Sequence, residues 1–160
     1  MSHPASTPDY PATAPPAPSQ AVEVVYPLLR RRGGLEPFPT IYYLRDPSLV
    51  HAMSELERRG FLKRFQDRLA ENPKLRRAFH DDHARYRDAR RAMLTAEDRR
   101  AVEASGSLSR AFSRGIAGIA NFDRIKCLHA HYAHHLILAD TGGTVVGRLI
   151  DEAHESETAL

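Results

Sequence analysis

Apolar side chains recur every three or four residues along most of the chain after residue 46, which is the spacing of one face of a helix. Asp46-Pro47 is a typical helix start, with an aspartate cap and proline at the first helical position. Asn72-Pro73 and Thr95 are further start signals, and Gly60 and Gly142-Gly143 are stop signals. The pattern predicts helices over 46–60, 61–72, 73–94, 95–104 and 122–139, and either a short terminal helix, which we favour, or a strand over 145–153.

Two short runs ahead of these helices favour β-strands. Val22–Tyr26 is β-branched and aromatic, and Ile41–Leu44 has the same character. We expect the two runs to pair as a small antiparallel element, joined by a loop of about 14 residues in which Arg30–Gly34 is basic and flexible. The sequence therefore predicts a mainly helical α+β fold, with a small N-terminal β element packed on about five helices.

The composition changes at both ends of the chain. Residues 1–21 hold six of the eleven prolines and a single charged residue, Asp9. Such a segment buries too little apolar surface to offset the entropy of ordering, so we predict a disordered Pro/Ala-rich tail. No linker-like stretch divides the remainder, so residues 22–152 are predicted to form one domain and residues 153–160 a frayed C-terminus.

The overall composition is typical of a soluble globular protein, with 160 residues, 42% hydrophobic and 27% charged. No apolar run is long enough to span a bilayer, and no secretory signal is readable at the N-terminus. The lone cysteine, Cys127, excludes an internal disulfide framework and fits a reducing compartment. We therefore expect a cytoplasmic protein with no membrane partner.

Basic residues outnumber acidic ones by 23 to 20, and all but three of the basic residues are arginine. Arginine makes bidentate contacts to phosphate and carboxylate, so an anionic small molecule or a protein is a plausible partner. Most of these charges are nevertheless expected on solvated helix faces. Nucleic acid is not an expected partner, because the chain has no paired zinc-ligand spacing and no RNA-binding signature.

The segment Lys126–His135 concentrates the residues that carry chemistry. Four of the nine histidines lie there, the first of them two residues after the only cysteine. Thiolate and imidazole are the usual ligands of Zn²⁺ and related metals, so a zinc or iron site is one hypothesis. On a helix, residues four apart share a face, which would place Cys127, His131 and His135 in one row with His134 alongside, and direct His129 elsewhere. The candidate ligands are Cys127, His129, His131, His134 and His135, with Cys127, His131 and His134 preferred.

A set of ligands on one helix is only part of a metal site, and another segment has to complete it. The residues that could do so are His51, His80, Asp81, Asp82 and His83. Two other interpretations of the segment stay open. The histidines can be packed or solvated, with Cys127 as a small buried hydrophobe. Alternatively, Cys127 can be a thiol nucleophile with His131 as its base, assisted by backbone N–H groups of Gly115–Gly118.

The glycine-containing run Gly115–Ile119 precedes the last long predicted helix. Backbone N–H groups at a helix start attract anions, so Arg114, Gly115, Gly118 and Arg124 are candidates for an anion-binding site. The run matches neither the P-loop nor the dinucleotide-binding pattern. Close packing of this loop against the β element is the alternative interpretation.

Three motifs, in this order, carry a family resemblance: Pro37–Leu44 (PFPTIYYL), Gly115–Ile119 (GIAGI) and Lys126–Ala130 (KCLHA). Together they resemble the bacterial family known as domain of unknown function 501, over roughly residues 22–150. The resemblance implies a cytoplasmic bacterial protein and no particular reaction. Some members lie in genomes beside a cell-division septum initiator and an exopolyphosphatase-like gene, which is an association only.

The resemblance also bears on the candidate site. Cys127, His129 and His134 stand where the family has a Cys-Leu-His-Ala motif and a following histidine, whereas His131 and His135 are additional. Many relatives carry cysteines near the first strand and before the proline that starts the first helix. Here those places read Val24-Val25-Tyr26 and Arg45-Asp46-Pro47. Either the additional histidines replace these thiols, or this branch has lost the metal.

Two functional hypotheses follow. The first is a protein with a Cys/His metal site on its last long helix, which acts as a metal-dependent hydrolase on an anionic phosphate substrate. The second is a non-enzymatic interaction module linked to cell division or phosphate metabolism. The sequence identifies neither a catalytic residue nor a substrate.

Overall fold

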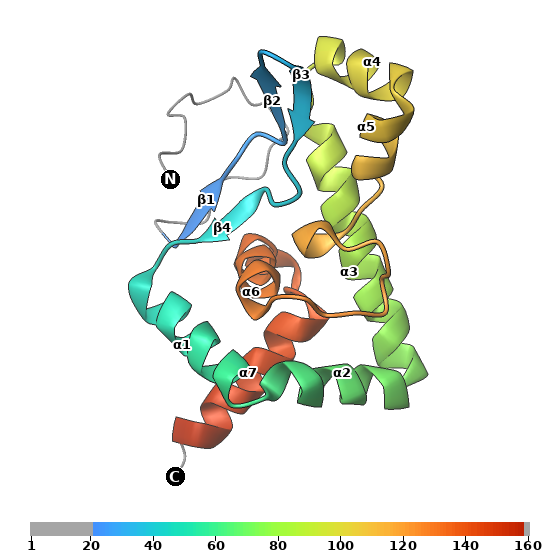
Figure 1. The fold of residues 1–160 in the computed structure, drawn as a ribbon. Helices are drawn as coiled ribbons and strands as arrows, with labels where there is room; N and C mark the ends of the chain where they lie inside the picture. The colour runs from blue at the N-terminus through green and yellow to red at the C-terminus, as the bar shows by residue number, and fades with distance from the viewer. Residues whose placement is uncertain (1–20, 159–160) are drawn as a thin grey trace.

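The computed structural model describes residues 21–158, with side chains as far as residue 156. Helices dominate this range, and four short strands precede them (Figure 1). The predicted mainly helical α+β class is confirmed, whereas the predicted disorder at the N-terminus falls on residues 1–20, outside the described residues. The elements are β1 (Val22–Val24), β2 (Leu28–Arg31), β3 (Gly34–Pro37), β4 (Tyr42–Leu44), α1 (Pro47–Arg58), α2 (Phe61–Glu71), α3 (Pro73–Ala92), α4 (Ala96–Ala104), α5 (Gly106–Ala111), η1 (Ile116–Gly118), α6 (Leu128–Ile137), η2 (Ala139–Thr141) and α7 (Val145–Thr158).

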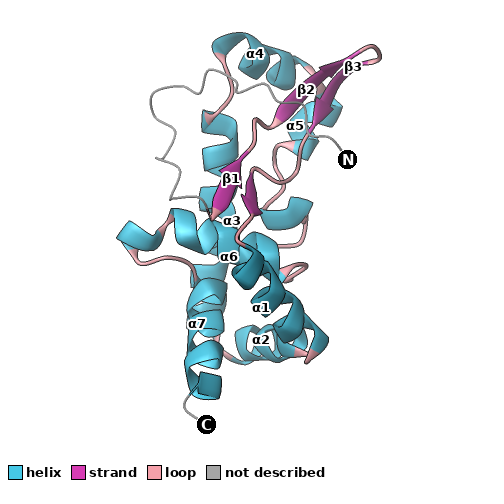
Figure 2. Cartoon of the chain, turned by 90° about the vertical axis from the view of Figure 1, so that its left-hand side faces the viewer, coloured by secondary structure: helices cyan, strands magenta, loops and turns pink. Residues whose placement is uncertain are grey.

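The strands form two antiparallel pairs, of which β2–β3 lies at one end of the molecule and β1–β4 nearer its middle (Figure 2). β1 pairs with β4, with Val22 opposite Leu44, which confirms the predicted pairing of the two strand segments. β2 and β3 form a second pair, so the prediction of a loop over Arg30–Gly34 was wrong. Arg31 pairs with Gly34, and the two residues between them make the tight turn.

The predicted starts of α1, α3 and α4 are confirmed by hydrogen bonds at their caps. The side chain of Asp46 accepts from the Leu49 N–H at 3.0 Å, and Asn72 accepts from the Leu75 N–H at 3.0 Å. The hydroxyl of Thr95 caps α4 in the same way. Each bond satisfies one of the donors that the first turn of a helix leaves without a partner.

The C-terminal half differs from the prediction in three places. The helix predicted over 122–139 begins only at Leu128, after an irregular stretch, because Cys127 has extended backbone angles (φ −151°, ψ 120°). The short helix α5 lies in a segment for which no helix was predicted. The terminal helix was expected to end at residue 153, but α7 continues to Thr158.

α6 is the central helix of the fold. It packs against α7, β4 and α1, and it lies between the strands and the other helices (Figure 1). The main core surrounds it and includes Tyr42, Phe79, Tyr86, Leu128 and Val146. A smaller apolar cluster holds the β2–β3 hairpin against α4 and α5. None of the helices in the described residues has the length and apolar character needed to cross a membrane.

Candidate metal centre

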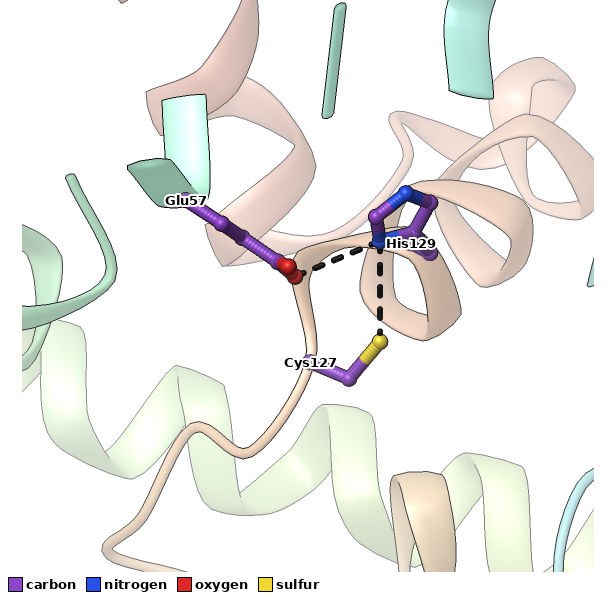
Figure 3. A group of neighbouring side chains, drawn as sticks. All are labelled: Glu57, Cys127 and His129. Atoms are coloured by element: carbon purple, nitrogen blue, oxygen red, sulfur yellow. Dashed lines mark hydrogen bonds and ion pairs between the residues drawn. The ribbon is translucent and has the colours of Figure 1, made fainter. Parts of the chain in front are cut away.

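Three side chains that can bind a metal converge where the last turn of α1 meets the start of α6. The carboxylate of Glu57, the thiol of Cys127 and the imidazole of His129 each bring one ligand atom within 4.8 Å of the other two (Figure 3). The Nδ1 atom of His129 lies 3.3 Å from Glu57 Oε1 and 3.8 Å from Cys127 Sγ. In the part of the chain that the structure describes, no other group of three or more His, Cys, Asp or Glu side chains converges in this way.

The local backbone explains the convergence. Cys127 occupies the cap position of α6 in an extended conformation, and His129 lies in the first turn of that helix. Glu57 reaches across from α1 and accepts a hydrogen bond from the Leu128 N–H at 2.8 Å. A carboxylate is favourable at this point because the N-terminus of a helix carries a partial positive charge. The same contact holds Glu57 beside the thiol and the imidazole.

The hydrogen bonds of the His129 ring depend on which of its nitrogens carries the proton. Its Nε2 atom lies 3.2 Å from the carbonyl oxygen of Val50 and 3.1 Å from the hydroxyl of Ser54. A carbonyl oxygen can only accept, so the tautomer with its proton on Nε2 donates to Val50, whereas the other tautomer donates from Nδ1 to Glu57. In the first tautomer, Nδ1 presents a lone pair to Glu57 and Cys127. This outer hydrogen bond to a backbone carbonyl is a common feature of metal-binding histidines.

Two of the three distances between the ligand atoms are close to those of a tetrahedral metal site. With bonds of about 2.0 Å to nitrogen or oxygen and about 2.3 Å to sulfur, tetrahedral angles place the nitrogen about 3.3 Å from the oxygen and about 3.6 Å from the sulfur. The corresponding distances from Nδ1 of His129 are 3.3 Å and 3.8 Å. An ion could therefore be bound with only small movements of the three side chains.

Electrostatics at the cluster favour a cation. Burial raises the pKa of the Cys127 thiol and the charge of Glu57 raises it further, whereas the N–H groups of Ala130 and His129 lower it. A bound cation would instead lower the pKa of the Cys127 thiol, because it stabilises the thiolate and offsets the charge of Glu57. The side chains of Glu57 and His129 are 31% and 27% exposed, so an ion or a small ligand can reach the site from solvent.

The same geometry does not suit a thiol nucleophile activated by a catalytic triad. In such a triad, one ring nitrogen of the histidine contacts the nucleophile and the other contacts the acid. Here, Nδ1 of His129 faces both Cys127 and Glu57, while Nε2 is engaged by Val50. His131, the base that the sequence suggested for the thiol, is buried elsewhere in the core.

His131 and His134 lie inside the core rather than at the cluster. Both are 1% exposed. The ring of His131 stacks on Phe79 at 5.6 Å, and the ring of His134 stacks on Tyr42 at 5.8 Å. Burial lowers the pKa of His131 well below its usual value and lowers that of His134 to about 3, so both are neutral. The expected row of ligands depended on Cys127 being helical, and α6 begins after it.

His135 has structural partners on both ring nitrogens. Its Nδ1 atom accepts from the Thr144 N–H at 2.8 Å, and its Nε2 atom lies 3.0 Å from a carboxylate oxygen of Asp151. The hydroxyl of Tyr132 donates to the other oxygen of that carboxylate at 2.9 Å. This network joins α6 to α7 and leaves neither nitrogen of His135 facing Cys127.

The histidines and acids considered for completing the site lie apart from Cys127. His80 contacts Asp123 at 2.6 Å, and His83 is buried, with its Nδ1 atom accepting from the Ile116 N–H at 3.1 Å. Asp82 accepts from the Val145 N–H at 2.7 Å and so caps α7. His51 and Asp81 are exposed on α1 and α3. The side chain that the structure places beside Cys127 and His129 is instead Glu57 of α1.

The glycine run is packed into the protein. A side chain at Gly115 would meet His83 at 2.4 Å, and one at Gly118 would meet Pro39 at 2.9 Å. The N–H groups of both glycines donate within the loop itself, and that of Ile116 donates to His83. Arg114 donates to the Gly118 carbonyl, and Arg124 is exposed. These N–H groups are therefore already engaged and do not point to an anion site.

Sequence reasoning missed Glu57 as a member of the cluster. The residue continues the stripe Val50, Met53 and Leu56, which faces the core of the molecule. A carboxylate on an otherwise apolar stripe was the available signal, because such a group needs a partner when it is partly buried. Nothing in the local pattern indicates that its partner lies 70 residues further along the chain.

Comparison with known proteins gives one match. The model of a family described as "Protein of unknown function (DUF501)" matches residues 15–152, which include Glu57, Cys127 and His129. No curated protein and no solved structure matches the chain. The family description contains no activity, so the geometry of the cluster has to carry the functional argument.

Proposed function

Because the chain belongs to the DUF501 family, whose description states no function, we propose its function from the site itself: it binds one transition-metal ion at Glu57, Cys127 and His129. The observation that carries this proposal is the orientation of His129. When its Nε2 atom donates to Val50, the Nδ1 atom of the neutral ring faces a carboxylate and a thiol, neither of which offers that nitrogen a strong donor. A metal ion satisfies all three groups at once.

Zinc is the best match to this set of ligands. One nitrogen, one oxygen and one sulfur combine harder and softer ligands, which Zn²⁺ accepts in a tetrahedral arrangement. Ferrous iron, the other metal expected from the sequence, also accepts imidazole and carboxylate ligands. Three protein ligands leave a fourth position for water or an outside ligand, as in catalytic rather than structural zinc sites.

The fourth position supports a narrower proposal, hydrolysis of a phosphate ester. Zinc lowers the pKa of bound water to about 7 and supplies a hydroxide nucleophile at neutral pH. The partial exposure of Glu57 and His129 would admit a substrate. Release of nitrophenol from p-nitrophenyl phosphate by the zinc-loaded protein tests this step. Absence of turnover by a fully loaded protein would reject hydrolysis of this ester and leave the metal-binding proposal intact.

Metal binding is tested by elemental analysis of the full chain, expressed without a histidine tag and purified without chelator. We expect about one zinc per chain, and cobalt substitution should give the absorption of a thiolate-bound tetrahedral ion. Cys127→Ser and His129→Ala should weaken binding by more than the 10- to 100-fold typical of outer-shell changes. His51→Ala is the matched control, because His51 is an exposed histidine on α1 outside the cluster.

Two results would overturn the proposal. One is a protein that takes up no zinc, iron or cobalt after reloading under reducing conditions. The other is full retention of the metal by both Cys127→Ser and His129→Ala. Circular dichroism of each variant distinguishes loss of a ligand from loss of the fold. We expect the variants to fold, because the side chains of Glu57 and His129 are partly exposed and Cys127 precedes the helix.

A further inference from the structure

A groove between α2 and α7 has a chemical character of its own. It has a volume of about 440 Å³, which lies within the usual range for small-molecule sites. Its floor is apolar and is formed by Phe61, Phe65 and Leu149. None of the three proposed metal ligands lines it, so the groove is a separate feature.

Three arginines line this groove along α2 and the turn before it. The guanidinium of Arg64 lies 4.3 Å from the centre of the Phe61 ring, and that of Arg59 lies 5.5 Å from the same centre. Arg68 follows one turn after Arg64 and completes the row. The contacts with the Phe61 ring restrict the conformations of the Arg59 and Arg64 side chains. These side chains therefore lose less conformational entropy when a ligand binds.

The groove carries an excess of positive charge. Among its lining residues, Glu152 on α7 is the one carboxylate, and it contacts Arg68 at 3.2 Å. Three arginines against one glutamate leave a formal charge of +2. A hollow of about 520 Å³ between α3, α4 and α5 differs in this respect, because Arg91 and Arg99 are balanced there by Asp88 and Glu103.

We propose that the groove between α2 and α7 binds a small organic phosphate monoester. Such a group carries about two negative charges at neutral pH and three acceptor oxygens, which matches the charge excess and the donors of the arginines. The volume exceeds what a phosphate group alone fills. The organic part of the ligand would therefore lie against the apolar floor, while the phosphate lies between Arg64 and Arg68.

The test uses phenyl phosphate as the probe, titrated into the metal-free, isotopically labelled full chain at constant ionic strength. We expect saturable amide shifts confined to α2, the turn before it and the facing part of α7. The double variant Arg64→Gln, Arg68→Gln should weaken the binding at least about tenfold, since two charge-assisted contacts are lost. Inorganic phosphate should bind more weakly than phenyl phosphate, because it does not contact the floor.

The matched control is Arg77→Gln, which removes one exposed arginine of α3 outside the groove. It should leave the affinity within about twofold, since a distant exposed charge is largely screened at working ionic strength. The proposal would be overturned if the amide shifts were spread over arginines in all helices. It would also be overturned if the control and the double variant weakened the binding of phenyl phosphate equally. Each arginine that is changed is exposed, so melting temperatures should confirm that the variants are folded.

Discussion

The imidazole of His129 has a different partner on each ring nitrogen, and this difference determines what the cluster can do. A proton or a metal ion at Nδ1 relieves the contact between its lone pair and the carboxylate of Glu57. A proton satisfies only that pair, whereas an ion also engages Cys127. Because the thiol and the imidazole must both lose protons to bind a metal, affinity for zinc should fall as the pH is lowered.

The backbone at Gly147 is pressed against His135, which gives a prediction about stability. A Cβ atom at this position would lie 2.0 Å from Cγ and 2.1 Å from Nδ1 of His135. The ring cannot move aside without losing its bonds to Thr144 and Asp151. Gly147→Ala should therefore lower the free energy of unfolding by about 3 kcal/mol, measured by urea denaturation, although alanine is the better helix former.

The control for this prediction is Gly33→Ala in the turn between β2 and β3. A Cβ atom there meets nothing within 4 Å, and Gly33 does not have a positive φ. The change should stay within about 0.5 kcal/mol, as is usual for exposed sites without special contacts. Equal stabilities of the two variants would show that His135 yields to the new methyl group.

The start of α6 illustrates how an element depends on a distant residue. Cys127 makes no side-chain cap to this helix, and the carboxylate of Glu57 accepts from the Leu128 N–H instead. Glu57→Ala should lower the stability of the metal-free protein by about 1 kcal/mol, the usual effect of losing a cap. Glu57→Gln keeps an oxygen acceptor and should lose less than half of that.

The same pair of variants separates the cap from the metal ligand. Both should weaken zinc binding, because an amide is a poorer ligand than a carboxylate, while their stabilities without metal should differ. Urea denaturation in chelator gives the stability, and competition with a chromophoric chelator gives the affinity. Wild-type affinity in Glu57→Ala would exclude Glu57 as a ligand and leave only its role at the helix start.

Three helices with explicit cap residues were predictable from sequence, whereas α5, which Ser105 caps, and the elements formed by contacts between segments were not. The sequence predicts a helix start at each of three residues, and each of them caps a helix in the structure: Asp46, Asn72 and Thr95. The hairpin of β2 and β3 was missed, although the two glycines after Arg32 are a known turn signal. Both strands are short, and β2 contains two arginines and β3 a glycine and a proline, so packing on α4 and α5 has to stabilise the hairpin.

At the scale of the molecule, the candidate site combines residues that no local pattern connects. Glu57 and Cys127 belong to α1 and to the cap of α6, two elements that are in contact in the fold although α2 to α5 lie between them in the sequence. The density of histidines indicated α6 as the helix of the candidate site. It did not distinguish His129 at the start of this helix from His131 and His134 in the core. Burial separates these roles, and burial is a property of the complete fold.

The buried histidines make the stability of the whole molecule depend on pH. Burial lowers the pKa of His83 to about 4 and that of His134 to about 3, whereas an unfolded histidine titrates near 6.5. Protons therefore bind first to the unfolded chain, so stability is complete above pH 6.5 and is lost as the pH falls toward these values. Each histidine should contribute a loss of up to about 1.4 kcal/mol per pH unit.

Urea denaturation between pH 6.5 and 5, where ordinary carboxylates stay ionised, measures this dependence of the free energy of unfolding on pH. His134→Leu should reduce this slope, and His51→Leu, at an exposed position, should leave it nearly unchanged. A slope that is the same in all three proteins would mean that the pKa of His134 is the same in the folded and the unfolded chain.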